Sequence, residues 1–138
     1  MASELKVDKF TGVTTAGSIV VTGEGGSTTT NLQQGLAKAW VNFDGTGTIA
    51  TADSFNHSSL TDHSTGQYSN TISSAMSNTT YAGQANGGEP GSRDCHTMFP
   101  STSVFTTTAQ RVRLAPSNSA DGNHDASVVC ITINGDLA

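Results

Sequence analysis

The sequence predicts an all-β protein, an antiparallel β-sandwich or jelly roll of about eight strands that follows an N-terminal β arm. Several short segments place an apolar residue at every second position, as a strand with one buried face does. Turn-forming residues separate these segments every eight to twelve residues or so. No helix-length window repeats its apolar residues with a period of 3.6. We therefore expect an attachment arm at residues 1–31 and a β-sandwich body at residues 32–138.

The composition limits the classes of partner. A chain of 138 residues is long enough to bury a core of its own. Charged residues make up only 12% of it, against about 25% in an average protein, and its net charge is −5. Six basic residues are too few for the clustered phosphate contacts of a nucleic-acid binder. Arg111 and Arg113, the closest basic pair, are expected on a solvated strand face, so we expect no nucleic-acid partner.

Hydropathy gives no sign of a membrane partner. No apolar run reaches the length of a signal-peptide core or of a membrane span. We therefore expect neither a membrane anchor nor export through a conventional leader.

The predicted arm contains two short strands. Residues 5–10 alternate in hydropathy and residues 18–22 are a β-branched run, so both segments are predicted to be strands. The glycine-rich segment at residues 23–31 has the composition of a flexible linker. Because two strands alone are marginal in water, the arm should either pair with a partner or complete the main sheet, and the sequence leaves both open. The apolar residues expected to attach it are Leu5, Val7, Phe10, Ile19, Val20 and Val21.

The central strand of the body is predicted at residues 38–43, after one helical turn capped by Asn31. Ala39, Val41 and Phe43 share one face of this strand, and Trp40 lies on the other. A strand with large apolar side chains on both faces is expected to be covered on both, by a second sheet or by another subunit. We therefore predict a homotrimer. The residues expected in its packing core and oligomer contacts are Trp40, Val41, Phe43, Tyr68 and Tyr81.

The rest of the body is predicted as strands and turns. Asp44-Gly45 is a strong hairpin signal, with the return strand at residues 46–51. A turn is predicted at 61–66 and loops at 86–93 and 116–124. Residues 97–100 form a short apolar segment that Pro100 confines to a sheet edge or a strand end. The further strands are expected at residues 67–73, 79–85, 103–115 and 126–134. Cys95 and Cys130 allow one internal disulfide, but a buried free thiol is the default expectation for Cys130.

Residues that could carry chemistry are sparse. The segment at 121–125 begins like a calcium loop, but Ala126 and Thr132 stand where a glycine and a glutamate are needed. The histidines lack zinc-site spacing, although His57 or His63 could meet its copies at a trimer axis. Asp94 and His96 flank Cys95, yet neighbours on a strand point to opposite faces, so no nucleophile–base pair is expected. We therefore expect no enzyme activity, no cofactor and no resident metal.

One stretch resembles a known protein class. Residues 39–48 read AWVNFDGTGT, and looser matches follow at residues 54–56, 58–62, 65–68, 75–76 and 81–82. Over residues 36–82 the chain resembles a module of tailed-bacteriophage structural proteins, which are fibres, fibre-like decorations and other virion-surface proteins. In such proteins N-terminal segments commonly attach the chain to the virion.

The resemblance implies a structural role on a bacteriophage particle. The expected function is a virion protein displayed on the surface as a capsid decoration or short fibre, made in the host cytoplasm and held by its arm. Its expected partners are its own copies and the capsid, neck or tail proteins. The alternative is a receptor-binding tail-fibre or tail-tip module whose loops, such as 86–93 or 116–125, bind host-surface glycans; those loops lack the exposed aromatic residues that sugar sites use.

Overall fold

A computed structural model gives the fold of the chain and describes residues 4–13, 19–23, 25–89, 93–100, 104–117 and 122–138. The chain divides into two compact units, Met1–Leu36 and Ala37–Ala138, which we call the arm and the body. The division falls later than the expected boundary after residue 31. The reason is local, because the helical turn α1 (Leu32–Gly35) follows the last strand of the arm directly.

The arm contains a two-stranded antiparallel hairpin. Strand β1 (Val20–Thr22) pairs with β2 (Thr29–Asn31), with Val20 opposite Asn31. The connecting turn is closed by Gly23 N, which donates to Thr28 O at 2.7 Å. Part of the segment predicted as a flexible linker is therefore the second strand. The strand predicted at residues 5–10 is wrong, because those residues form no strand in the structure.

The predicted helical turn is confirmed at α1. Asn31 Oδ1 accepts hydrogen bonds from Gln33 N at 2.8 Å and from Gln34 N at 3.3 Å. An asparagine side chain in this position satisfies N–H groups that the first helical turn leaves without an intrahelical acceptor. No helix in the described part of the chain is long and apolar enough to cross a membrane.

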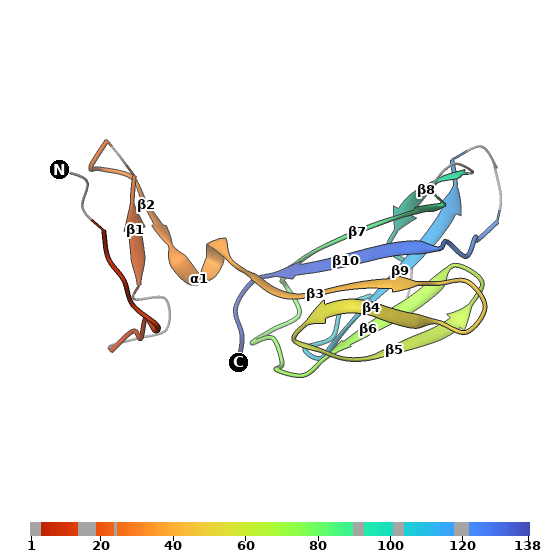
Figure 1. Ribbon diagram of the computed structural model, residues 1–138, viewed down its shortest axis with the longest axis horizontal. Helices are drawn as coiled ribbons and strands as arrows, with labels where there is room; N and C mark the ends of the chain where they lie inside the picture. The colour runs from red at the N-terminus through yellow and green to blue at the C-terminus, as the bar shows by residue number, and fades with distance from the viewer. Residues whose placement is uncertain (1–3, 14–18, 24, 90–92, 101–103, 118–121) are drawn as a thin grey trace. The chain divides into compact units, whose positions relative to one another are not determined.

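The body is one antiparallel sheet of eight strands, which confirms the all-β prediction (Figure 1). Its order is β4-β3-β10-β7-β8-β9-β6-β5. The edge strands β4 and β5 are consecutive in sequence, with Asn56 between them, so the sheet curls until it nearly closes as a flattened barrel. This arrangement is compatible with a sandwich. The strands are β3 (Ala37–Asp44), β4 (Ala50–Phe55), β5 (His57–Ser64), β6 (Gln67–Ile72), β7 (Ala82–Glu89), β8 (Arg93–Met98), β9 (Ala109–Pro116) and β10 (Val128–Asn134).

Alternation along the strands fills the interior. In β3, β6, β9 and β10 every second residue is buried, as the period of a strand with one core face requires. One cluster of buried residues comprises Val41, Phe43, Tyr68, Val112, Leu114, Ala126, Val129 and Ile131. A second cluster comprises Ala39, Ile72, Met76, Tyr81 and Ile133. The body therefore has a core of its own.

The loop predicted at residues 86–93 is wrong at residues 86–89, which belong to β7, and at Arg93, which begins β8; residues 90–92 lie outside the described residues. Glycine normally weakens a strand, but here it makes room inside the barrel. A Cβ on Gly87 would lie 2.2 Å from Leu114 Cδ2, and one on Gly83 would lie 2.3 Å from Gln110 Nε2. The glycines therefore let the large side chains of β9 pack against the backbone of β7.

Other strand boundaries also differ from the predictions. The return strand of the first hairpin is residues 50–55, not 46–51, so the turn after Asp44 is longer. Residues 61–64, predicted as part of a turn, lie in β5. Strand β9 begins only at Ala109, because the chain turns back at residues 106–109, where Thr106 N donates to Ala109 O at 2.9 Å. Residues 97–98 form the end of β8, which lies between β7 and β9, so this segment is at a strand end and not at a sheet edge.

Two glycines in positive-φ conformations allow a matched test of this packing. Gly66 has φ +64° and is surrounded by backbone, since a Cβ there would lie 2.6 Å from His124 N. Gly47 has φ +61°, and nothing would lie within 4 Å of its Cβ. We expect Gly47→Ala to reduce the free energy of unfolding by about 1 kcal/mol through backbone strain alone. We expect Gly66→Ala to reduce it by about 3 kcal/mol or more, because strain and overlap add.

The measurement is urea denaturation followed by Trp40 fluorescence and circular dichroism. Equal losses in the two variants would contradict the packing around Gly66.

Candidate functional site

The arm exposes the apolar residues that the sequence assigns to attachment. The exposed fractions are 73% for Leu5, 47% for Val7, 61% for Phe10, 56% for Val20 and 52% for Val21, and Ile19 is partly exposed. None of the described residues of the arm is buried. Among its described residues the arm thus presents apolar side chains without a buried core.

The residues assigned to the packing core fall into two groups. Val41, Phe43, Tyr68 and Tyr81 are buried, and the rings of Phe43 and Tyr68 meet edge-on at 5.2 Å. Trp40 differs, because it lies on the outer face of β3 and is only partly buried. The expectation that both faces of this strand are fully covered therefore does not hold within the body. The homotrimer stays a prediction.

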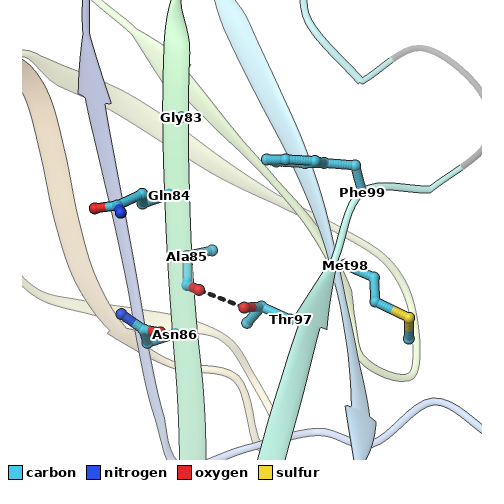
Figure 2. Close-up of a pocket in the computed structure, with 7 residues that line it drawn as sticks. All are labelled: Gly83, Gln84, Ala85, Asn86, Thr97, Met98 and Phe99. Atoms are coloured by element: carbon cyan, nitrogen blue, oxygen red, sulfur yellow. Dashed lines mark hydrogen bonds between the residues drawn. The ribbon is translucent and has the colours of Figure 1, made fainter.

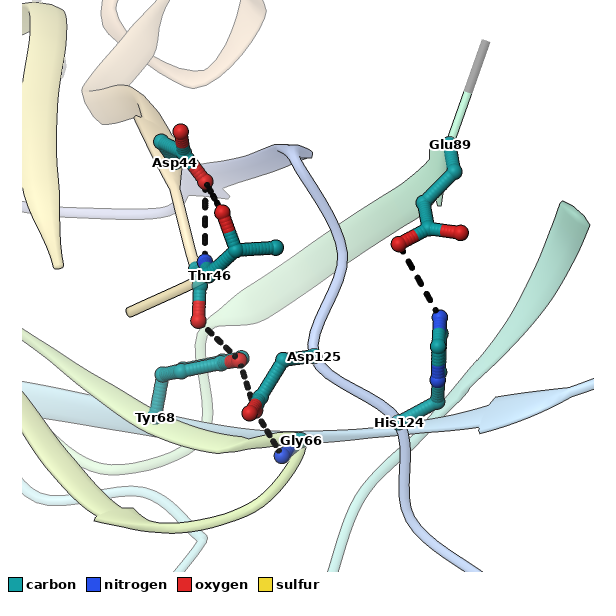
Figure 3. A network of polar contacts seen from close by, with 8 residues as sticks. Asp44, Thr46, Gly66, Tyr68, Glu89, His124 and Asp125 are labelled. Carbon is teal, nitrogen blue, oxygen red and sulfur yellow. Dashed lines mark hydrogen bonds and ion pairs between the residues drawn. The ribbon is translucent and has the colours of Figure 1, made fainter. Parts of the chain in front are cut away.

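A polar network closes one end of the barrel (Figure 3). Tyr68 Oη lies 2.6 Å from Asp125 Oδ1 and 2.9 Å from Gly45 O, so one phenolic proton faces two acceptors. Asp125 Oδ1 also accepts from Gly66 N at 2.6 Å. Burial raises the pKa of Tyr68, and the neighbouring Asp125 raises it further. The network joins the turn after β3, the turn before β6 and the segment that leads into β10.

The segment that begins like a calcium loop is engaged with protein groups. Asp125 belongs to the network above, and Arg113 Nε donates to Asn123 Oδ1. His124 Nε2 lies 3.3 Å from Glu89 Oε1 (Figure 3). Residue 121 lies outside the described residues. Among the described residues no group of three or more His, Cys, Asp or Glu side chains is placed to hold a metal ion.

The other candidate ligands are dispersed. His57 Nδ1 lies 2.7 Å from Asn70 Oδ1, and its Nε2 lies 3.2 Å from Thr51 Oγ1. His63 Nε2 lies 2.8 Å from Ser69 Oγ. No disulfide joins Cys95 and Cys130. Cys130 is only partly buried and shares the outer face of β10 with Thr132, so the expectation of a buried thiol is wrong.

A cavity of about 230 Å³ lies where β7 and β8 diverge (Figure 2). Thr97 Oγ1 donates to Ala85 O across the divide, and Phe99 packs against Phe105 with ring centroids 5.0 Å apart. The lining has no acidic or basic side chain, so it offers no group for acid–base catalysis. Sequence reasoning missed it because glycine-rich and proline-flanked segments were read as loop and edge. The lining residues are Gly83, Gln84, Ala85, Asn86, Thr97, Met98 and Phe99.

The outer face of strands β4, β3, β10 and β7 is the second feature that the sequence did not show as a unit. Strand register places Trp40 opposite both Phe55 of β4 and Thr132 of β10. Thr132 in turn is opposite Gln84 of β7. The neighbouring row, two residues along each strand, comprises Asp53 of β4, Asn42 of β3, Cys130 of β10 and Asn86 of β7. We call these two rows the Trp40 face.

No protein-family model, no curated protein and no solved structure matches this chain.

The end network predicts unequal effects of removing the two tyrosine hydroxyls. We expect Tyr68→Phe to reduce the free energy of unfolding by about 1.5–3 kcal/mol, because the partly buried carboxylate of Asp125 loses a donor. We expect Tyr81→Phe to cost about 1 kcal/mol, because its hydroxyl serves only the carbonyls of Thr106 and Ala109, at 3.0 and 2.9 Å. Denaturant unfolding of both variants measures the difference, and a neutral Tyr68→Phe variant would contradict the network.

Alkaline titration supplies a second prediction, since the chain has two tyrosines. Burial raises the pKa of Tyr81 from 10.0 to about 12, and the pKa of Tyr68 is raised as well. Above pH 10 the unfolded chain releases phenolic protons that the folded chain retains, so the tyrosine contribution to stability is fully present below pH 10 and falls as the pH rises toward 12. We expect tyrosinate absorbance to appear together with loss of circular dichroism. Ionisation of either tyrosine near pH 10 in a fully folded chain would contradict its burial.

Proposed function

We propose that this chain is a structural protein of a tailed-bacteriophage virion, displayed on the particle surface as a decoration or short fibre. The arm binds a capsid, neck or tail protein, and the body faces outward. The role is mechanical and needs no catalytic group.

The observation that carries the proposal is the contrast between the two units. The body buries two apolar clusters of its own, whereas the arm leaves its apolar side chains exposed. A two-stranded hairpin without a core is marginal in water, so its stable state includes a partner. The exposed edges of β1 and β2 offer unpaired backbone groups to which a partner strand can add.

The AWVNFDGTGT stretch supports the assignment to phage structural proteins through its place in the fold. It forms most of β3 and the turn after it, where Ala39, Val41 and Phe43 enter the core. Gly45 packs so closely against Tyr68 that a side chain does not fit there, since a Cβ on Gly45 would lie 2.6 Å from the phenolic oxygen. The matched residues are thus those that hold the body together, which fits a shared structural module.

Separating the units tests the proposal. We expect the body alone, residues 37–138, to fold with the circular dichroism and Trp40 emission of the full chain, because both apolar clusters lie within it. We expect it not to join virions that lack the protein, whereas the full chain does. Incorporation of the body alone, measured by immunoblot of purified particles, would overturn the role of the arm.

Point variants give a matched control. Val20→Asp and Val128→Asp place the same charge on an exposed valine, at 56% exposure in the arm and 37% in the body. We expect Val20→Asp to lower incorporation at least about tenfold and Val128→Asp to leave it unchanged, because only the first buries a charge on attachment.

A further inference from the structure

We propose that the Trp40 face binds a neutral oligosaccharide. The ligand is recognised by two aromatic side chains in one row and by amide and hydroxyl side chains that have no hydrogen-bond partner among the described residues. The inference stands apart from the virion role, since it concerns a surface of the body and not of the arm.

The geometry of the face is set by strand register. Phe55, Trp40, Thr132 and Gln84 lie directly opposite one another across four neighbouring strands. Neighbouring strands are about 4.8 Å apart, so this row is about 14 Å long. A short run of sugar rings fits along it.

The aromatic end of the row suits the apolar face of a sugar ring. Phe55 is 53% exposed, and Trp40 beside it is partly exposed. Directly opposite side chains on antiparallel strands have Cβ atoms about 5 Å apart, so Phe55 and Trp40 are neighbours on the same face of the sheet. The indole N–H makes no hydrogen bond with any described residue and remains a donor for a hydroxyl group.

The amide end of the face suits the hydroxyl groups of a sugar. The side chains of Asn42, Gln84, Asn86 and Thr132 make no hydrogen bond to any residue that the structure describes. Each can both donate and accept, as each sugar hydroxyl can. Because sugars offer donors and acceptors in equal measure, such side chains match them without a charge.

The charges favour a neutral ligand over an acidic one. Asp53 is the only charged residue in the two rows, and its Oδ1 accepts from Ser54 N at 2.8 Å. A sialylated or sulfated ligand would meet this carboxylate without a basic partner in either row. Like charges brought together in this way lower affinity.

A hollow adjoins the far end of the row. Gln84 and Asn86 also line the cavity of about 230 Å³ between β7 and β8, and Figure 2 shows both side chains on the β7 strand that forms its wall. Phe99, 48% exposed, lines the same cavity. The site thus passes from an aromatic platform through amides to a pocket, which is the mixture of apolar surface and few polar groups typical of ligand sites.

A second copy of the chain fits the face less well. Dry packing of two copies would bury the Asp53 carboxylate, for which neither row offers a basic partner, and this is unfavourable. A hydrated oligosaccharide supplies partners to the side chains of Asn42, Gln84 and Asn86 directly or through water.

The experiment uses the full chain. A glycan array carrying neutral, sialylated and sulfated oligosaccharides identifies candidates, and neutral trisaccharides from it are then titrated by calorimetry and by the emission of Trp40, the single tryptophan. We expect at least one neutral trisaccharide to bind and to change Trp40 emission. We expect Phe55→Ala and Trp40→Ala each to weaken binding about tenfold or more.

Matched variants separate the site from the fold. Phe10→Ala removes a ring of similar exposure, 61%, from the arm and should bind as the unchanged chain does. Gln84→Ala should weaken binding severalfold without changing the denaturation midpoint. Three results would each overturn the inference: no neutral saccharide binds, Phe55→Ala binds normally while folded, or light scattering shows that Phe55→Asp dissociates an oligomer and that copies therefore occupy the face.

Discussion

The hydrogen bonds between Tyr68, Asp125 and Gly66 hold three chain segments together at one end of the barrel. The ring of Tyr68 packs edge-on against Phe43, and its buried oxygen lies within hydrogen-bond distance of Asp125 Oδ1 and Gly45 O. Three segments distant in sequence are therefore fixed by one side chain. Because the phenol is buried beside a carboxylate, its neutral form is the stable one. The phenolic proton donates to Asp125, and its retention avoids placing a phenolate charge in the core. A second bond, from Gly45 N to Ala126 O at 2.9 Å, holds two of these segments in the same register.

The sequence predicts those strands in which buried positions alternate with exposed ones, because this alternation is visible as a hydropathy pattern. Strands β3, β6 and β10 were predicted because apolar residues alternate with polar ones, and the structure buries the alternating set. Only the first half of β7 was predicted, as part of the strand expected at residues 79–85. Its second half was missed because glycines such as Gly87, which packs against Leu114, are frequent there and suggest a loop. The turn before β9 was missed for the opposite reason, since a run of threonines favours a strand and the turn depends on hydrogen bonds that composition does not show. The Trp40 face and the cavity depend on which strands become neighbours, and a single sequence does not state the order of strands.

The interior also holds two amides that specify the pairing of β6 with β9. Asn70 and Gln110 lie directly opposite each other and are fully buried, with Asn70 bonded to His57. The amide nitrogen of Asn70 and both amide atoms of Gln110 make no hydrogen bond with the residues that the structure describes. Such groups lower stability, but a slip by one residue would be worse, since it would turn Arg111 into the core and Val112 to solvent. The amides are therefore tolerated at the register in which the charged residues of β9 stay outside.

The two outer faces of the body show why residue type alone does not identify a site. On one face Arg111 Nη2 donates to Gln67 Oε1 at 3.1 Å and Arg113 bonds to Asn123, so its polar groups already serve the fold. On the Trp40 face the amides are just as well positioned by strand register, yet they have no protein partner among the described residues. Polar side chains held in fixed rows beside exposed aromatic rings gain nothing for folding from that arrangement. A bound ligand would supply donors and acceptors to these side chains. We therefore infer that the ligand is recognised by the sheet face and not by the loops.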